Sequence, residues 1–116
     1  MSGLFMGQPY VGAAACVLVL TAVPERSLRK YSERGYRYLL LEAGHAAQNI
    51  ALTASALGLG ALPVGGFFDD DVSALLGLDP TQEVPLYAIA LGVPASSDPV
   101  ALRGFARAQT SPEDSP

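Results

Sequence analysis

The sequence predicts an α+β domain in which a small sheet is flanked by helices and one long helix lies at the centre. Two nearly continuous apolar runs, residues 11–21 and 84–92, are typical of central strands that are buried on both faces. Between these runs, residues 42–59 carry apolar side chains at three- and four-residue spacing, which predicts a helix. The chain has 116 residues, which is enough for one small domain.

The first predicted strand contains the only cysteine of the chain. Gly7, Gln8 and Pro9 precede it and predict a turn that leads into the strand. Cys16 lies in the apolar run AAACVLVL, so we expect a buried and inert thiol. A single cysteine excludes an intrachain disulfide. Because the chain also has one histidine only, we expect no structural zinc site.

Basic side chains are concentrated in the helix predicted for residues 24–34. Pro24 suits the first turn of this helix, and Gly35 is predicted to stop it in a left-handed conformation. Five of the 7 Lys and Arg residues lie in or just after the helix, namely Arg26, Arg29, Lys30, Arg34 and Arg37. The cluster is either a solvated helix face or a cationic site for an anionic cofactor or substrate.

The long helix predicted for residues 42–59 is apolar nearly all round, so we expect it in a core or a subunit interface. A chain in which 50% of the residues are hydrophobic also indicates a large subunit interface. Gly58 and Gly60 are predicted to end the helix. A short extended segment, residues 61–64, then leads into a glycine pair where backbone can approach a flat ligand.

Three aspartates at positions 69–71 predict the start of a short helix. One of them can cap the free N–H groups, and the others suit the positive end of the helix dipole. Gly77 is predicted to stop this helix. The composition then divides the chain into a domain over residues 1–94 and a tail over residues 95–116. In the tail we expect a short helix at 101–108 and a disordered end.

The charge of the chain excludes some partners. The formal net charge is −4 at pH 7, which argues against nucleic acid. The apolar residues 11–22 are too short to span a bilayer as a helix, and no Lys or Arg precedes them as in a signal peptide. We therefore predict a cytoplasmic protein that binds neither membranes nor nucleic acid.

Three stretches of the sequence are shared with a known family. They are GQPY at 7–10, KYSERGYRYLLLEAGHAAQNIALTASALGLGALPVGGF at 30–67, and EVPLYAIALGVP at 83–94. These stretches resemble the nitroreductase family of flavoproteins, and most closely the branch that oxidises azoline rings in thiazole- and oxazole-modified peptides. The resemblance implies a mixed sheet flanked by helices, a dimer formed through long helices, and FMN in a groove at the dimer interface. It covers the C-terminal half of the family domain.

The resemblance also implies roles for individual residues. Lys30 and Tyr31 resemble the catalytic Lys-Tyr pair of the azoline-oxidising branch, and either could take the proton that leaves an azoline ring while hydride passes to the flavin. Four residues resemble the segment whose backbone faces the flavin ring near N5 and O4, namely Pro63, Val64, Gly65 and Gly66. Arg103 and Arg107 are the candidates for contact with the FMN phosphate.

Three polar residues of the long helix have less specific roles. His45 either touches the cofactor or substrate, or is a hydrogen-bonded histidine at a helix start. Glu42 and Asn49 are expected to be structural. No metal ligands are predicted.

Two functions are compatible with the sequence. One is an FMN-dependent oxidoreductase resembling the azoline dehydrogenases, which acts on a small molecule or modified peptide as a homodimer or with a complementary chain. The alternative is a non-catalytic dimerising remnant or partner module that lacks a complete flavin pocket. The alternative arises because the Arg-rich segment that holds the FMN phosphate lies in the N-terminal half of family members. The chain could also be a fragment of a longer reading frame.

Overall fold

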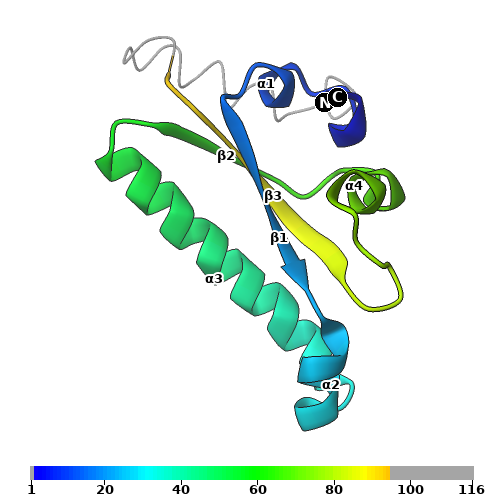
Figure 1. The fold of residues 1–116 in the computed structure, drawn as a ribbon. Helices are drawn as coiled ribbons and strands as arrows, with labels where there is room; N and C mark the ends of the chain where they lie inside the picture. The colour runs from blue at the N-terminus through cyan, green and yellow to red at the C-terminus, as the bar shows by residue number, and fades with distance from the viewer. Residues whose placement is uncertain (1, 95–116) are drawn as a thin grey trace, which may run out of the picture.

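The computed structural model describes residues 2–94, which form one three-stranded sheet with helices on both faces (Figure 1). Along the chain, the elements are η1 (Ser2–Phe5), α1 (Pro9–Gly12), β1 (Cys16–Ala22), α2 (Pro24–Tyr31), α3 (Arg34–Ala56), β2 (Gly60–Val64), α4 (Asp69–Leu76) and β3 (Val84–Gly92). The predicted order of strand, helix, long helix, short extended segment, short helix and strand is confirmed. No helix within residues 2–94 is long and apolar enough to cross a membrane.

The strand β3 lies in the middle of the sheet and pairs antiparallel with both of its neighbours. The strand order is β1-β3-β2, and Ala88 of β3 lies opposite Val19 of β1 and Val64 of β2. Because β3 is paired on both edges and covered on both faces, Ala88 and Ile89 are fully buried. This confirms the prediction that residues 84–92 form a central strand.

The prediction for the first strand was wrong in its start and in its position. The strand begins at Cys16, and the residues before it form the short helix α1 in place of the predicted turn into a strand at Gly7–Pro9. Among the described residues, β1 is an edge strand with a partner on one side only. Cys16 is therefore exposed and not buried. Continuous apolarity did not distinguish an edge strand from a central one.

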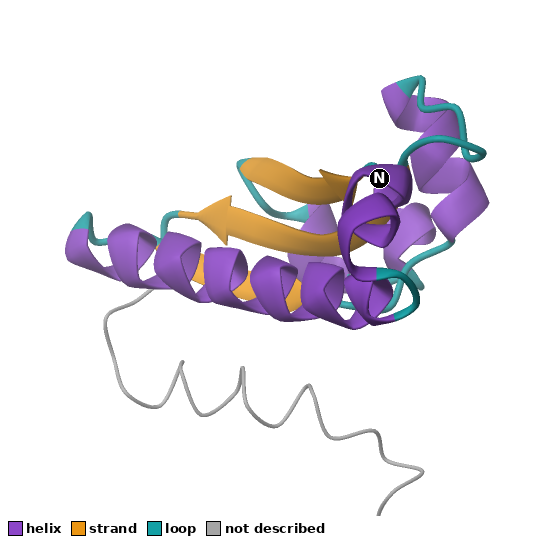
Figure 2. Cartoon of the chain, turned by 90° about the horizontal axis from the view of Figure 1, so that it is seen from below, coloured by secondary structure: helices purple, strands orange, loops and turns teal. Residues whose placement is uncertain are grey.

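The two faces of the sheet carry different helices. On one face, Val17 and Val19 of β1 align with Ala88 and Ala90 of β3 and pack against the core formed with η1, α1 and α4. On the other face lies α3, which runs along the sheet (Figures 1 and 2). Side chains alternate between the faces along each strand, so Cys16 and Leu18 point to the α3 side.

The corner between α2 and α3 differs from the prediction. α2 ends at Tyr31 because Ser32 adopts a positive φ of 54°. Gly35 was predicted to stop that helix but lies in the first turn of α3. This helix starts at Arg34, eight residues before the predicted start at residue 42.

The C-terminal end of α3 agrees with the predicted glycine stop. Gly58 has a φ of 74°, and the Leu59 N–H donates to the Ala54 carbonyl over 2.8 Å. Gly60 instead begins β2.

The short helix α4 starts and stops where the sequence predicts. Its first turn is acidic, which suits the helix dipole, but no aspartate side chain caps it, because the N-cap position belongs to Phe68. Gly77 ends it in the left-handed conformation with a φ of 70°. In the turn that follows, Asp79 accepts hydrogen bonds from the Thr81 N–H over 2.9 Å and from its hydroxyl over 2.7 Å.

The close approach of α2 and α3 predicts opposite effects for two glycines of α3. A Cβ on Gly35 would lie 2.8 Å from the backbone carbonyl of Ser27, whereas a Cβ on Gly44 would meet nothing within 4 Å. We expect Gly35→Ala to lower the free energy of unfolding by about 1–3 kcal/mol, because two backbones must move apart. Gly44→Ala should raise it by roughly 0.5–1 kcal/mol through helix propensity. Urea denaturation of both variants tests this, and equal effects would contradict the packing.

The turn after α4 predicts a low titration midpoint for one carboxyl. The Thr81 hydroxyl, and then the Thr81 backbone N–H, lower the pKa of Asp79 below the ordinary aspartate value. The turn is thus stabilised at pH values above the unfolded pKa, and this stabilisation is lost as the pH falls through the folded pKa. Carboxyl NMR titration should show Thr81→Ala moving the Asp79 midpoint upward. Gln82→Ala is the control that leaves it in place, and an unmoved midpoint in Thr81→Ala would refute the assignment.

Candidate functional site

The glycine pair after β2 is held between two buried residues. Val64 ends β2 and is 4% exposed, and Phe67 follows the pair and is 8% exposed. The Phe67 ring packs edge-on against Phe5 of η1, with the ring centroids 5.9 Å apart. The Phe68 N–H donates to the Leu4 carbonyl over 2.9 Å. Both ends of the Gly65–Gly66 segment are therefore fixed, one by the sheet and the other by η1.

The backbone of this segment is open to an approaching ligand. Gly65 is exposed, and a Cβ built on it would meet nothing within 4 Å. A Cβ on Gly66 would lie 3.3 Å from the sulfur of Met6, the residue after η1, so Gly66 has less free space than Gly65. Pro63 is also exposed, while Val64 points into the core. A planar group can thus reach the backbone at Gly65 without displacing a side chain.

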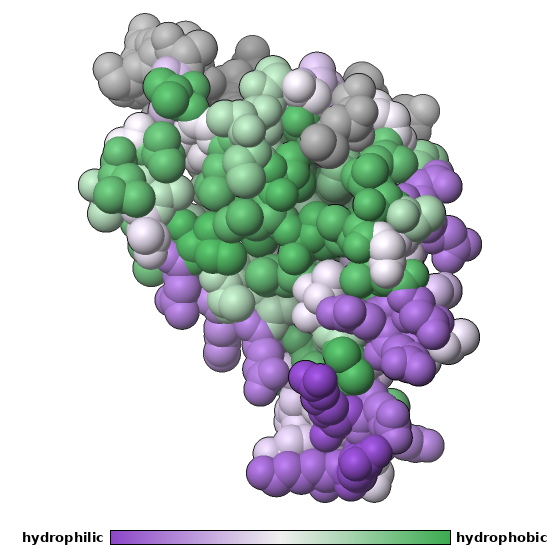
Figure 3. Space-filling view, in the orientation of Figure 1, coloured by the Kyte–Doolittle hydropathy of each residue, from purple (hydrophilic) through white to green (hydrophobic). Residues whose placement is uncertain are grey.

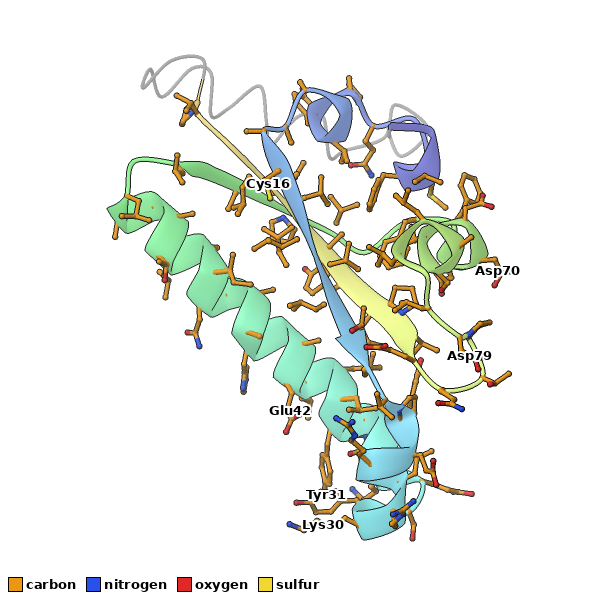
Figure 4. All side chains as sticks on the ribbon, in the orientation of Figure 1. Cys16, Lys30, Tyr31, Glu42, Asp70 and Asp79 are labelled. Carbon is orange, nitrogen blue, oxygen red and sulfur yellow. The ribbon has the colours of Figure 1, made fainter. Side chains whose placement is uncertain are left out.

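Lys30 and Tyr31 lie at the C-terminal end of α2, on the outside of the α2–α3 corner (Figure 4). The Tyr31 ring meets the Tyr38 ring of α3 edge to face, with 5.0 Å between centroids and 89° between planes. The Lys30 Nζ lies 5.2 Å from the centroid of the Tyr31 ring, within range of a cation–π contact. Both side chains are exposed, with Tyr31 at 45%. The pair is thus preformed and open to solvent.

Within one chain, the structure does not bring this pair next to the glycine segment. Figure 4 places Lys30 and Tyr31 beyond the lower end of the sheet, whereas the connection from β2 to α4 lies beside the middle of the sheet. The two groups of predicted site residues therefore occupy different regions of the surface.

The basic residues share the lower region with the Lys-Tyr pair. Within residues 2–94, every Lys and Arg belongs to α2 or to the first turn of α3, and these helices form the hydrophilic lower end in Figure 3. Arg29 pairs with Glu25 over 2.7 Å on the exposed side of α2. Arg103 and Arg107 lie outside the described residues. Residues 2–94 therefore fit the part of a flavin site that faces the ring, but place no cation for a phosphate beside Gly65.

The polar residues of α3 form no further site. His45 is exposed in the middle of α3, so the alternative of a hydrogen-bonded histidine at a helix start was wrong. Glu42 and Asn49 are exposed as well, and the Asn49 backbone carbonyl accepts a hydrogen bond from the Thr53 hydroxyl over 2.8 Å. Among residues 2–94, no cluster of His, Cys, Asp and Glu could hold a metal ion.

The sequence did not predict that η1 packs against the glycine segment and fixes one end of it. The first ten residues show no hydrophobic period, so no element was predicted there. The signal that could have indicated it is Phe5, an aromatic residue in a stretch without a period, which needs a buried partner such as Phe67.

The prediction that the long helix is apolar nearly all round was wrong, because the exposed surface of α3 mixes leucines with polar residues such as Glu42, Gln48 and Asn49. The buried residues of the helix are small, namely Gly35, Ala47 and Ala54. Four leucines are 45–70% exposed, namely Leu40, Leu41 and Leu52 of α3 and Leu57 at its C-cap. Exposed leucines of this kind are compatible with a subunit interface. Dimerisation through this helix remains a prediction.

Two curated proteins are similar to this chain over most of its described length. The chain is 40% identical over 85 residues to the nitroreductase homologue MJ1384 of Methanocaldococcus jannaschii, a match that covers 73% of this chain and 41% of the relative. It is 33% identical over 81 residues to the microcin B17-processing protein McbC of Escherichia coli, covering 70% of this chain and 28% of the relative. The chain thus spans less than half the length of these curated relatives.

A solved structure extends the likeness to the fold. The structure is the E. coli microcin synthetase McbBCD complex with truncated pro-MccB17 bound. It matches with a TM-score of 0.65 and 34% identity, over 71% of this chain and 30% of that chain. Finally, the family model described as "Nitroreductase family" matches residues 4–93, which include all eight elements except the first two residues of η1. The resemblance seen in the sequence is confirmed, and the chain belongs to the nitroreductase family.

Proposed function

We propose that this chain takes part in an FMN-dependent oxidation resembling that of the azoline dehydrogenases. The observation that carries the proposal is the open backbone at Gly65, fixed on one side by β2 and on the other by the Phe5–Phe67 contact. The similarity to McbC, a microcin B17-processing protein, supports a modified peptide as the substrate class.

The proposed work of the glycine segment is to bind and orient the flavin ring. FMN, when bound, supplies the acceptor for a hydride. The backbone of Pro63, Val64, Gly65 and Gly66 would lie against the ring, where N–H groups favour negative charge. Because Val64 and Phe67 are buried, this backbone cannot retreat from a ligand, which makes the segment preorganised.

The proposed work of the Lys-Tyr pair is to take the proton that an azoline ring loses. Loss of a hydride and a proton together converts the azoline to the aromatic azole. The acceptor would be the neutral amine of Lys30 or the phenolate of Tyr31, and the edge-to-face contact with Tyr38 fixes the Tyr31 ring. Because both side chains are exposed, a second chain would have to cover them to exclude water from the reaction.

The separation of the two regions favours an assembly in which one site is built from two chains. A second copy, or a complementary chain carrying the rest of the domain, would bring a Lys-Tyr pair toward a glycine segment. The exposed leucines of α3 would provide the contact. Arg103 and Arg107 are the proposed partners of the FMN phosphate, and the cytoplasm is the proposed location of the assembly.

The alternative proposal is a non-catalytic dimerising module. The observation that favours it is the placement of all cations of residues 2–94 on α2 and at the start of α3, away from Gly65. A flavin held by backbone alone would lack an anchor for its phosphate.

Flavin titration distinguishes the two proposals. We expect the full chain to bind FMN, and Gly65→Ala to weaken this binding by about tenfold, because a methyl group would stand between ring and backbone. Gly44→Ala is the matched control, since its Cβ also meets nothing within 4 Å but lies on α3. Quenching of flavin fluorescence measures both. A full chain that leaves FMN free would rule out a flavin site made by copies of this chain and favour the dimerising module.

The Lys-Tyr pair has its own test. In the flavin-loaded protein or assembly, Lys30→Ala with Tyr31→Phe should slow azole formation on a thiazoline peptide by roughly 10²–10⁴-fold, the usual contribution of a positioned proton acceptor. Circular dichroism should be unchanged, because both side chains lie on the surface. Arg26→Ala, on the same helix, is the control and should retain full activity. Undiminished turnover in the double variant would remove the catalytic assignment.

A further inference from the structure

One side of α3 faces outward along most of its length. In Figure 1, α3 is the outermost element on its side of the sheet, and no other described element lies beyond it. Side chains three and four positions apart share one side of a helix. The exposed residues with this spacing are Arg37, Leu41, His45, Gln48, Leu52 and Ser55. We call these six residues the outer face of α3. It has one leucine on each side of a polar centre.

The order of these residues makes the outer face complementary to itself in an antiparallel contact. A two-fold axis midway between His45 and Gln48 sets His45 opposite Gln48 of a second copy. The same axis sets Leu41 opposite Leu52 of that copy. The imidazole then meets an amide that can both donate and accept a hydrogen bond, and each leucine meets a leucine. Each pair therefore matches in polarity.

The charges at the ends of the helix favour the same arrangement. Arg37 makes no ion pair or hydrogen bond within residues 2–94. In the antiparallel contact it would lie at the last turn of the second copy's α3, beside Ala56. This turn is the negative end of the helix dipole, and α3 has no basic residue of its own there. A parallel contact would instead bring the two Arg37 side chains together.

We propose that α3 pairs antiparallel with α3 of a second copy, with His45 of each chain against Gln48 of the other. The polar centre fixes the register, as single polar residues do in coiled coils. Sliding one helix by two turns sets His45 against Leu41 of the second copy in one direction, and Gln48 against Leu52 in the other. Either shift covers a polar group without giving it a partner, which is unfavourable.

The contact selects one of the two partners considered for the assembly. A second copy is favoured over a complementary chain because the outer face matches itself in both polarity and charge. The inference therefore rests on the two-chain form of the proposed function. It involves neither Gly65 nor the Lys-Tyr pair, so it can be measured without FMN. Its failure would leave the flavin titration to decide the proposed function separately.

Cysteine cross-linking tests the register. In a Cys16→Ser background, a chain with Leu41→Cys is mixed with a chain with Leu52→Cys under mild oxidation. We expect a covalent dimer in the mixture and little in either chain alone. Two copies of the same cysteine would lie eleven residues apart along the helices, or about 16 Å, which is beyond the reach of a disulfide.

A matched control uses the neighbouring leucine. Leu40 is also exposed but lies about 100° around the helix from Leu41, so Leu40→Cys with Leu52→Cys should not cross-link. Cross-linking in the single chains but not in the mixture would indicate a parallel contact. Absence of a cross-link in every sample would indicate that no second copy lies on this face. Equal cross-linking with the control would indicate random collision. Each of these three results would overturn the proposal.

Acidic substitutions test the polar centre without cysteines. His45→Asp with Gln48→Asp would bring four carboxylates together and should raise the Kd of the dimer by about tenfold or more in sedimentation equilibrium. Asn49→Asp with Thr53→Asp adds the same number of carboxylates on the side of α3 that faces Leu18 and Leu91, and should leave the Kd nearly unchanged. Circular dichroism verifies that both variants are folded. If the two double variants dimerise equally, the inference fails.

Discussion

The pairing of β3 with a strand on each side is the constraint on which the remaining structure depends. It buries Ala88 and Ile89 completely and sets the register of β1 and β2. That register decides which face each side chain takes. Val17, Val19, Leu62 and Val64 consequently meet the core under α1 and α4, while Leu18 and Leu91 turn to α3. The glycine segment inherits its position from Val64, the last residue of this pairing.

The sequence predicted the elements well and their environment less well. Strand β3, the glycine stops at Gly58 and Gly77, and the short helix after the aspartates are local features, set by a few neighbouring residues. The corner at Gly35 is different. There the glycine is required by the close approach of the Ser27 backbone, not by a left-handed turn, and the spacing of apolar residues contains no information about that contact. The same holds for Cys16, whose exposure depends on the order of strands in the sheet.

For the candidate site, the sequence indicated the residues but not their arrangement. The motif around Lys30 and Tyr31 and the motif at Pro63–Gly66 were found through the family resemblance. Their separation on one chain, and the support of the glycine segment by η1, are tertiary facts that follow from how α2 and η1 pack against other elements. The predicted arginines of the tail fall outside the described residues, so the phosphate side of the site stays a prediction.

Within residues 2–94, one edge of β1 is unpaired, and this edge affects how the protein behaves in solution. A strand with one open edge presents backbone N–H and C=O groups that can extend a sheet into another molecule, and natural proteins usually protect such edges with charge, proline or a cover. Between Cys16 and Ala22 the sequence CVLVLTA has no charge and no proline. Within residues 2–94, we expect this segment to be the first to extend a sheet into another molecule in concentrated solution, and a partner strand paired here would prevent that.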